Sequence, residues 1–520
     1  MLININAAKC IAIDAVPVTV EVDITHGVGI HLVGLADVAV KESLMRTVTA
    51  LQSMGFHVPG RRIVINLAPA DLHKKGSGYD LPIALGIIAA SEQVEMPLLS
   101  RFLIMGELGL DGAVRAIPGA LPFAELSLRL GLDGCILPEQ SALETVELEG
   151  AKVYGVKSLA DVLRILSGVE DVDELLIRHS EAFRHALESA NCADSYNGCM
   201  DFADIIGQEG AKRGAEIAVS GGHNLILIGP PGSGKSSLAK ALTGILPPMS
   251  QEESLLTSKI WSIAGKGSAH LGLIHRRPFR SPHYSASMPA IIGGGNGDNI
   301  LPGEVSLANS GVLFLDELAQ TPKSVIEALR GPIEDRRVCI SRLRSKIEYP
   351  ANFMLVAATN PCPCGYYGEG DRCTCTVGQR AAYLGRLSGP ILDRIDIHLW
   401  MHPVEPGKLV NREKGESSAA VAARVLAARE IQRERFKDEG ISTNAEMGTR
   451  QLERFCQLSD GCKEILERLI DRMGLSARAF TRIVKVARTI ADLAGERDIL
   501  PQHLAEAAGF RFLDRRNIGQ

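Results

Sequence analysis

One octapeptide carries the G-x-x-x-x-G-K-S pattern of a phosphate-binding loop, between an apolar run and a helix-like segment. The loop and the residue after it are Gly229, Pro230, Pro231, Gly232, Ser233, Gly234, Lys235, Ser236 and Ser237. Its glycines allow backbone N–H groups to face phosphates, and the N-terminus of the following helix adds positive charge. We expect Lys235 to reach the β and γ phosphates of ATP and Ser236 to ligate Mg²⁺. Because the motif alone could be a chance match, the residues downstream decide whether it is part of a nucleotide site.

Two further apolar runs end in polar side chains that suit phosphoryl transfer. Residues 311–315 precede Asp316 and Glu317, and residues 353–359 precede Asn360. Apolar runs without alternation are typical of parallel strands that are buried on both faces. We expect Asp316 to hold Mg²⁺, Glu317 to polarise the attacking water and Asn360 to orient that water. The alternative is a pair of core strands capped by solvated polar residues, but the order of all three after one phosphate-binding loop favours catalysis.

Three segments outside the loop resemble characteristic parts of AAA+ ATPases. They look like an adenine-pocket entry, an arginine-finger segment and a sensor-2 segment, at residues 201–208, 392–397 and 474–479. The resemblance implies that Arg394 completes the site of a neighbouring subunit in a homohexameric ring, and that Arg478 is a sensor-2 arginine on a lid. Arg386 is a second candidate for the finger. The alternative for Arg394 is an ordinary salt bridge with Asp393 or Asp396.

Two inserted segments narrow the resemblance within the AAA+ proteins. Residues 280–297 include a glycine-rich stretch, and residues 337–349 alternate like a β-hairpin with a basic tip. They resemble the helix-2 insert and the pre-sensor-1 hairpin of the magnesium-chelatase, MCM-helicase and σ54-activator branch, in which both elements face the central pore. The resemblance makes Arg342, Arg344 and Lys346 candidate DNA contacts, against the alternative of a solvated surface hairpin.

The N-terminal part of the chain resembles one subfamily of that branch. The matching segments are residues 67–72, 76–85, 106–115 and, in the ATPase part, 360–365. They are similar to the YifB/ComM family of magnesium-chelatase-like competence ATPases, and with the domain order the resemblance covers nearly all 520 residues. It implies a cytoplasmic bacterial helicase that acts on single-stranded and branched DNA, driving branch migration in DNA recombination during natural transformation.

The same N-terminal part also resembles the proteolytic domain of Lon, but its dyad positions are apolar. Ile83 stands where Lon has the catalytic serine, and Leu121 stands where Lon has the lysine. Because peptide hydrolysis by a serine needs a hydroxyl and a base, we expect a non-proteolytic scaffold. A replacement dyad of Ser77 with Lys74 or Lys75 is the alternative.

These features predict an α/β fold class: an AAA+ P-loop ATPase core with a helical lid, preceded by a Lon-protease-like, S5-like α+β domain. The predicted boundaries are an N-terminal domain at 1–165, a linker at 166–200, the ATPase core at 201–402 and the lid at 403–520. This length accommodates three domains with ample core. The combined prediction is an ATP-driven hexameric DNA motor. The alternatives are a magnesium-chelatase-type motor subunit that remodels a protein partner, and a nucleotide-dependent regulatory or adaptor protein.

The composition is ordinary for a globular protein, with 46% hydrophobic residues, 22% charged residues and a net charge of -5. No apolar run approaches the roughly 20 residues that span a bilayer, and residues 1–4 lack the features of a signal peptide. This predicts a cytoplasmic protein without membrane contact. The net charge excludes a uniformly basic surface but not phosphate contacts concentrated in a pore. With aromatic residues at 4%, contacts with the DNA backbone are favoured over base stacking.

The cysteines point to one metal site. Eleven cysteines without a secretion signal indicate reduced thiols rather than disulfides. Four of them flank a hydrophilic, glycine-containing loop: Cys362, Cys364, Cys373 and Cys375. Four thiolates on a short hairpin can hold a tetrahedral Zn²⁺ ion, which would order this loop. The C-x-C spacing is tighter than the usual C-x₂₋₄-C, so free thiols and an iron–sulfur cluster stay as alternatives.

Overall fold

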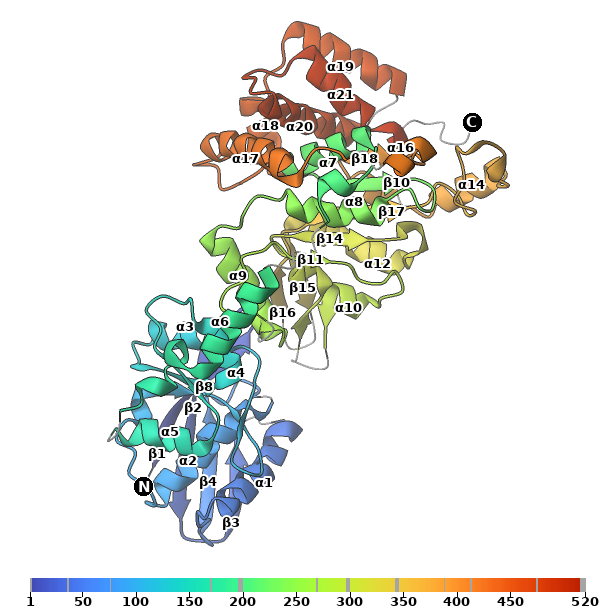
Figure 1. Ribbon diagram of the computed structural model, residues 1–520. Helices are drawn as coiled ribbons and strands as arrows, with labels where there is room; N and C mark the ends of the chain where they lie inside the picture. Colours follow the sequence, from blue (N-terminus) through green and yellow to red (C-terminus); the bar gives the residue numbers. More distant parts are fainter. Residues whose placement is uncertain are drawn as a thin grey trace.

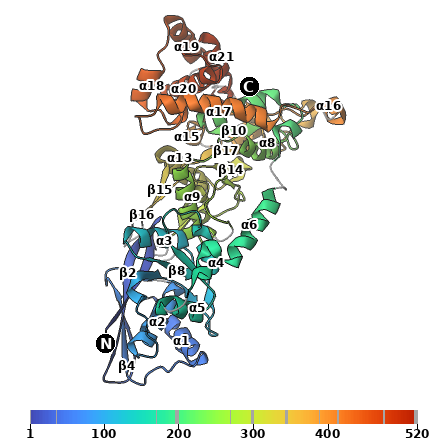
Figure 2. The same ribbon diagram turned by 60° about the vertical axis from the view of Figure 1, so that its left-hand side comes forward.

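The computed structural model describes residues 2–34, 37–74, 76–168, 171–194, 200–267, 270–295, 300–341, 346–387, 389–411, 414–473 and 476–514. The chain forms an N-terminal α/β part, an ATPase core and a helical lid, which follow one another along the length of the molecule (Figure 1). The same order is seen after a turn of 60° (Figure 2). The predicted DNA contacts Arg342 and Arg344, and the dyad candidate Lys75, lie outside the described residues.

The N-terminal part is built on a seven-stranded mixed sheet with the order β3-β4-β2-β1-β5-β8-β9. Its strands are β1 (Ile3–Ile11), β2 (Asp14–Thr25), β3 (Gly29–Val33), β4 (Arg62–Ala68), β5 (Phe102–Ile104), β8 (Gly134–Pro138) and β9 (Val153–Val156). Strands β1 and β4 run antiparallel to β2, and the remaining pairs are parallel. A short hairpin follows β5, formed by β6 (Glu107–Leu108) and β7 (Val114–Arg115).

Helices pack on this sheet, and one of them is apolar on every side. The helices are α1 (Val38–Ser53), α2 (Asp80–Ala90), α3 (Ala120–Arg129), α4 (Glu139–Ala142) and α5 (Leu159–Ser167). Almost every residue of α2 is buried, as expected for a core helix without a polar face. A Cβ at Gly86 would lie 2.4 Å from a methyl carbon of Val22, so the close approach of α2 to β2 needs glycine there.

No proteolytic dyad assembles among the described residues of the N-terminal part. Ile83 and Leu121 are both fully buried hydrocarbons. The hydroxyl of Ser77 bonds the carboxylate of Glu107, and the buried ammonium of Lys74 donates to a backbone carbonyl. Lys74 and Ser77 therefore have separate partners.

The ATPase core contains a five-stranded parallel sheet with the order β11-β14-β17-β10-β18. Its strands are β10 (Leu225–Ile228), β11 (Phe279–Arg280), β14 (Val312–Leu315), β17 (Met354–Thr359) and β18 (Ile397–Trp400). All residues of β10, β14 and β17 are buried, as the two uninterrupted apolar runs before Asp316 and Asn360 predict. The carboxyl ends of these strands meet at one edge of the sheet.

Helices cover both faces of this sheet, and the lid is entirely helical among the described residues. The core helices are α7 (Glu209–Gly221), α8 (Lys235–Ala241), α9 (Gln251–Ile263), α10 (Met288–Ile292), α11 (Glu304–Leu307), α12 (Lys323–Ala328), α13 (Arg330–Asp335), α14 (Val377–Leu384) and α15 (Gly389–Leu392). The lid helices are α16 (Pro406–Asn411), α17 (Ser418–Arg435), α18 (Thr449–Phe455), α19 (Asp460–Met473), α20 (Ala477–Leu493) and α21 (Pro501–Gly509).

Both inserted segments form short hairpins. The segment predicted as a basic hairpin folds into antiparallel β15 (Arg337–Ser341) and β16 (Lys346–Pro350). The glycine-rich segment contributes β12 (Gly293–Gly294), which pairs with β13 (Leu301–Pro302). These hairpins and α9 lie at the end of the core that faces the N-terminal part, away from the lid (Figures 1 and 2).

The N-terminal part contacts the ATPase core through α9. The ammonium of Lys259 lies 3.3 Å from Asp14 and 2.5 Å from Glu125, and the carbonyl of Ser262 accepts a 3.0 Å hydrogen bond from the backbone N–H of Gly119. The segment predicted as a linker contains a helix of its own, α6 (Glu181–Asp194).

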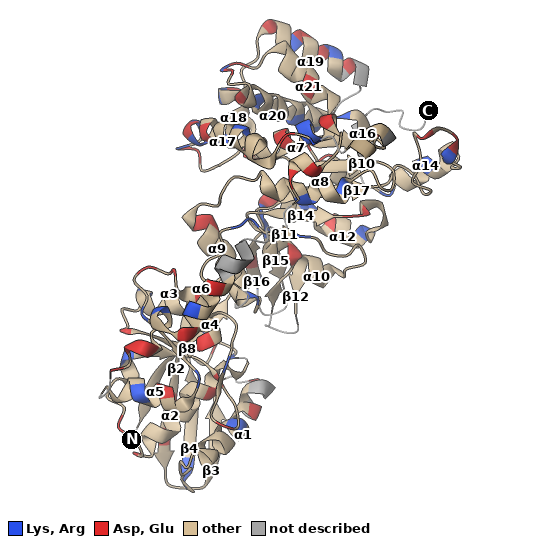
Figure 3. Ribbon diagram, viewed as in Figure 1, with Lys and Arg blue, Asp and Glu red and all other residues tan. Residues whose placement is uncertain are grey.

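Acidic and basic residues are intermixed in the N-terminal part and in the lid. Figure 3 shows acidic and basic positions interspersed along the lid helices and over the N-terminal part, in line with the small net charge. Among the described residues, no helix combines the length and the apolar character needed to cross a bilayer.

Candidate nucleotide site

The phosphate-binding loop joins β10 to α8 at the carboxyl edge of the core sheet. Gly232 and Gly234 have φ values of 79° and 91°, a region that glycine adopts at little cost and side chains rarely enter. Helix α8 then begins at Lys235, so its free N–H groups lie at the loop, and Ser236 and Ser237 form its first turn. A Cβ at Gly232 would meet no atom within 4 Å, which leaves space above the loop for phosphate oxygens.

The predicted catalytic side chains come together at this loop from three strands. The hydroxyl of Ser236 donates to Asp316 over 3.0 Å. The amide nitrogen of Asn360 donates to Glu317 over 3.0 Å, and the amide oxygen of Asn360 accepts from the Lys235 ammonium over 3.2 Å. These contacts bring together, at one loop, the residues that the sequence predicts to bind the phosphates, to ligate Mg²⁺ and to polarise water.

Burial lowers the pKa of the lysine in this cluster. Lys235 is 8% exposed, and burial lowers the pKa of its ammonium, against the opposing effect of Glu317 and Asp316. Its ammonium donates to the backbone carbonyls of Gly229 and Pro230 over 2.7 and 2.9 Å, which holds it beside the loop. The donor set suits a nucleotide with Mg²⁺: an ion held by hydroxyl and carboxylate oxygens would neutralise charge on the phosphates.

The segment that resembles an adenine-pocket entry contacts the loop directly. Gln208 adopts a left-handed conformation with φ of 61°, and its side-chain amide donates to the carbonyls of Ser233 and His402 over 3.2 and 2.5 Å. The carboxylate of Asp201 accepts from the backbone N–H of Ser418 over 2.9 Å. This segment therefore joins the loop to the start of the lid.

Arg394 and Arg478 make their contacts on another surface, not at the loop of their own chain. Arg394 is 5% exposed and forms an ion pair of 2.6 Å with Glu334 at the end of α13. This pair replaces the salt bridges with Asp393 or Asp396 that the sequence left open as alternatives. Arg478 is exposed, with a guanidinium nitrogen 4.0 Å from Asp393. The two arginines line one surface cavity of about 280 Å³.

Arg386, the second candidate for the arginine finger, is exposed on the segment after α14. Its guanidinium lies 6.0 Å from the centre of the Tyr383 ring. It is not among the described residues that line the cavity of Arg394 and Arg478.

A buried polar network, which the sequence analysis missed, holds the segment around Arg394 and Asp396 to the lid. Asp396 bonds His223 over 3.1 Å and Arg482 of α20 over 2.9 Å, and the other ring nitrogen of His223 lies 2.8 Å from the hydroxyl of Thr489. Burial lowers the pKa of His223 despite its carboxylate partner. The histidine thus serves as a fixed hydrogen-bonding link.

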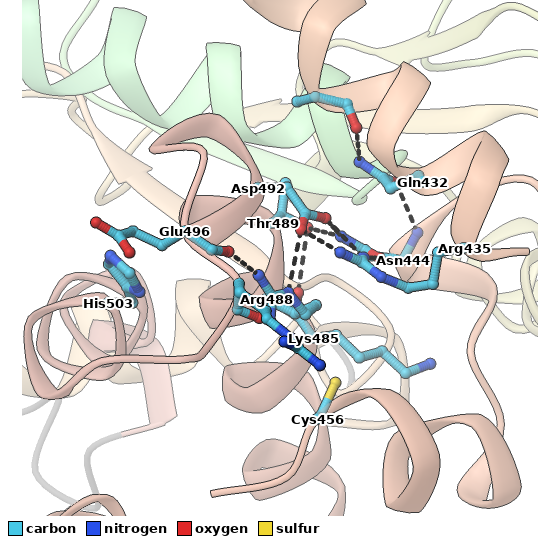
Figure 4. Close-up of polar contacts among 12 residues, drawn as sticks. Gln432, Arg435, Asn444, Cys456, Lys485, Arg488, Thr489, Asp492, Glu496 and His503 are labelled. Carbon is cyan, nitrogen blue, oxygen red and sulfur yellow. Dashed lines mark hydrogen bonds and ion pairs between the residues drawn. The ribbon is translucent and has the colours of Figure 1, made fainter.

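The network continues through the lid, where Figure 4 shows its members converging on Asp492. Asn444 donates to Asp492 over 2.8 Å, Arg488 donates to it over 3.1 Å, and Arg435 donates to it over 2.8 Å. Because Asp492 and Asn444 are almost completely buried, loss of one partner would leave an unpaired buried polar group, which is costly. The network therefore fixes α17 against α20.

The four predicted metal ligands gather beside the nucleotide site. The sulfur atoms of Cys362, Cys364, Cys373 and Cys375 all lie within 4.8 Å of one another, with separations of 3.3, 3.7 and 3.9 Å among the first three. Backbone N–H donors, chiefly that of Tyr366, lower the pKa of the Cys364 thiol to about 6. A Cβ at Gly365 would lie 2.8 Å from the Pro231 ring, so the cysteine loop packs directly on the phosphate-binding loop.

Of the three predicted DNA contacts, the structure describes one. Lys346 begins β16, pairs with Ser341 across the hairpin and is exposed. Its ammonium lies 3.6 Å from Glu348, which also lies 3.5 Å from Arg337 at the other end of the hairpin.

Comparison with known proteins places this geometry in a family. Residues 201–409 match the family described as magnesium chelatase, subunit ChlI, residues 20–141 match a ChlI subunit region, and residues 415–511 match the ChlI C-terminal region. The chain is 43% identical to YifB of Salmonella typhimurium over 516 residues, covering 98% of this chain and 97% of the relative. It is 43% identical to the competence protein ComM of Haemophilus influenzae over 500 residues, covering 96% and 95%.

A weaker match concerns Lon. The chain is 25% identical to an archaeal Lon protease of Methanocaldococcus jannaschii over 155 residues, 30% of this chain and 24% of that protein. The fold class predicted from the sequence is confirmed: an α/β ATPase core with a parallel sheet, preceded by a Lon-like part. The chain belongs to the YifB/ComM family of magnesium-chelatase ChlI-like AAA+ ATPases.

Proposed function

We propose that the protein is an ATP-driven hexameric DNA motor that remodels single-stranded and branched DNA during recombination. The observation that supports ATP hydrolysis is the cluster of Lys235, Asn360 and Glu317 at the phosphate-binding loop. In this cluster the side-chain amide of Asn360 bonds both the ammonium of Lys235 and the carboxylate of Glu317. In this cluster Glu317 polarises the attacking water, Asn360 orients it, and Lys235 stabilises charge on the phosphates.

The positions of the two arginines support assembly into a ring. Arg394 and Arg478 share a cavity, and their ion pairs are with Glu334 and Asp393 rather than with residues of the loop. Each chain then holds an incomplete site and offers two arginines to a neighbour. A closed ring of identical subunits satisfies every such head-to-tail contact, so we propose a homohexamer.

DNA as the substrate is supported by the relative called a competence protein and by the exposed basic hairpin. Lys346 lies on β16, which together with α9 is at the end of the core that faces the N-terminal part. We propose that Arg342, Arg344 and Lys346 contact the DNA backbone and that branch migration during natural transformation is the work performed.

The cysteine cluster supports a structural Zn²⁺ ion. Bonds of about 2.3 Å in a tetrahedron place sulfur atoms about 3.8 Å apart, close to the separations of 3.7 and 3.9 Å from Cys373 to the other two sulfur atoms, while Cys362 and Cys364 lie closer together, at 3.3 Å. We propose that the ion orders the loop that packs on Pro231.

One assay tests the motor. ATP turnover is measured without DNA and with single-stranded, duplex and four-way-junction DNA, and branch migration is followed on the junction in parallel. We expect ATP turnover to rise when DNA is added, and we expect the junction to undergo branch migration only when ATP is hydrolysed. The Lys235→Ala variant is the control for contaminating ATPases. Turnover that no DNA changes, together with unmoved junctions, would reject the motor and favour a magnesium-chelatase-type subunit or an adaptor.

A further inference from the structure

A second polar cavity lies at the opposite end of the ATPase sheet from the nucleotide site. It has a volume of about 70 Å³ and is lined by Gly311 and Met354, which flank the amino ends of β14 and β17, and by Ser442 of the lid. Three arginines share this lining: Arg277, Arg336 and Arg429. We call it the arginine cavity. Larger cavities of about 490 and 840 Å³ share lining residues with it, among them Arg336 and Asn352.

The three arginines differ in how their charge is balanced. Arg277 donates to both carboxylate oxygens of Glu253, over 3.0 and 2.8 Å. Arg336 donates to the side-chain oxygen of Asn352 over 2.5 Å, and Arg429 donates to the backbone carbonyl of Val219 over 2.9 Å. Within the described part of the chain, neither Arg336 nor Arg429 has a carboxylate at ion-pair distance.

The other acid in the lining is already engaged. Glu446 accepts from the backbone N–H of Ser442 over 2.9 Å and from the hydroxyl of Thr443 over 3.1 Å. It lies near enough to act on Arg429 through space, as does Glu253, while Arg277 acts in the opposite direction. The lining holds three cations and two anions: Glu253 is paired with Arg277, and Glu446 accepts hydrogen bonds from Ser442 and Thr443.

The chain maintains this arrangement at a cost. Arg336 ends α13 in the left-handed region, with φ of 55°, which is unfavourable for a residue with a side chain. Burial, with repulsion from Arg277, lowers the pKa of Arg429 to about 10. A partly buried cation without a counter-ion is destabilised, and a bound anion would remove that penalty.

We propose that the arginine cavity binds a phosphate-type oxyanion, supplied as inorganic phosphate or as the terminal phosphate of a nucleotide. Guanidinium groups present paired N–H donors that match phosphate oxygens. Arg429 belongs to α17 of the lid and Arg336 to the core, so the anion bridges the two. It therefore holds the lid against the core at a site separate from the phosphate-binding loop.

The test keeps the loop occupied throughout. Full-length protein carrying Mg²⁺ and one equivalent per chain of the non-hydrolysable analogue AMP-PNP, which fills the phosphate-binding loop, is titrated with inorganic phosphate by calorimetry, at constant ionic strength in chloride. We expect one phosphate per chain. Arg336→Gln and Arg429→Gln each weaken binding about tenfold or more, the range for lost charge-assisted hydrogen bonds. Arg468→Gln, on α19, exposed and paired with Glu464, lines none of these cavities and binds phosphate as the wild type does.

A second arm identifies the source of the phosphate. Excess AMP-PNP that displaces bound phosphate assigns the cavity to a nucleotide phosphate, and failure to displace it assigns the cavity to inorganic phosphate. Absence of phosphate binding to the wild type overturns the proposal. Equal binding by the wild type and both glutamine variants does so as well, and because Arg336 is only partly buried, its variant keeps the test valid if Arg429→Gln fails to fold.

Discussion

The side-chain amide of Asn360 donates to the carboxylate of Glu317 over 3.0 Å, although 43 residues separate them in the chain. The two residues follow neighbouring strands, β17 and β14, so their side chains meet at the carboxyl edge of the sheet. Glu317 itself adopts a left-handed conformation with φ of 50°, which turns the chain at this point. Strained backbone of this kind is often retained where function needs a fixed side-chain position.

Replacing Glu317 with Gln should abolish most ATP turnover while leaving ATP binding. The amide keeps the size of the side chain but cannot polarise water, and general-base effects are typically about a hundredfold or more. Steady-state turnover and nucleotide affinity measure the two effects. Glu464→Gln, a matched change on exposed α19, serves as the control. Wild-type turnover in Glu317→Gln would remove this residue from the mechanism.

Mixing two inactive variants should restore turnover. Arg394→Ala chains keep an intact phosphate-binding loop, and Lys235→Ala chains keep both arginines. Loss of an arginine finger typically costs about a thousandfold in turnover. An equal mixture should nevertheless recover about a quarter of the interfaces, because random assembly of a ring pairs intact loops with intact arginines at that rate.

Turnover measured against the mixing ratio checks this prediction. Recovery also shows that the Arg394→Ala chain still folds after losing its ion pair with Glu334. A mixture as inactive as its components, in rings shown to contain both chains, would contradict the assignment of Arg394 to a neighbour's site.

Metal analysis should find close to one zinc per chain in protein purified without chelators. Cys373→Ser should lower that content, because a tetrahedral site loses one of its thiolates. Cys339→Ser, which removes an exposed cysteine outside the cluster, should leave the zinc content unchanged. Zinc far below one per chain in fresh wild-type protein would support free thiols instead.

Combined replacement of Arg342, Arg344 and Lys346 by Ala should weaken DNA binding without regard to sequence. Each lost phosphate contact should reduce the salt dependence of binding by roughly one unit of slope. Affinities measured over a range of salt concentrations give this slope. Arg337→Ala, at the opposite end of the same hairpin and paired with the same Glu348 as Lys346, is the control. An unchanged slope in the triple variant would place the DNA contacts elsewhere.

The sequence by itself determined which residues form the candidate nucleotide site, because these residues lie in local patterns. The loop needs glycine at Gly232 and Gly234 to reach its φ values. Uninterrupted apolar runs marked the buried parallel strands, so the residues after them were placed correctly at one sheet edge. The close spacing of the four cysteines likewise predicted a cluster before any fold was known.

Tertiary structure alone decided the partners of residues that meet from distant segments. Arg394 pairs with Glu334 and not with its chain neighbours, because α13 brings that carboxylate to it. The bonds of His223 with Asp396 and Thr489 join residues 173 and 266 positions away. The approach of Arg336 and Arg429 depends on how the lid docks on the core. No periodicity or motif encodes these long-range contacts, because they form only when packing of the apolar surfaces has fixed where each element lies.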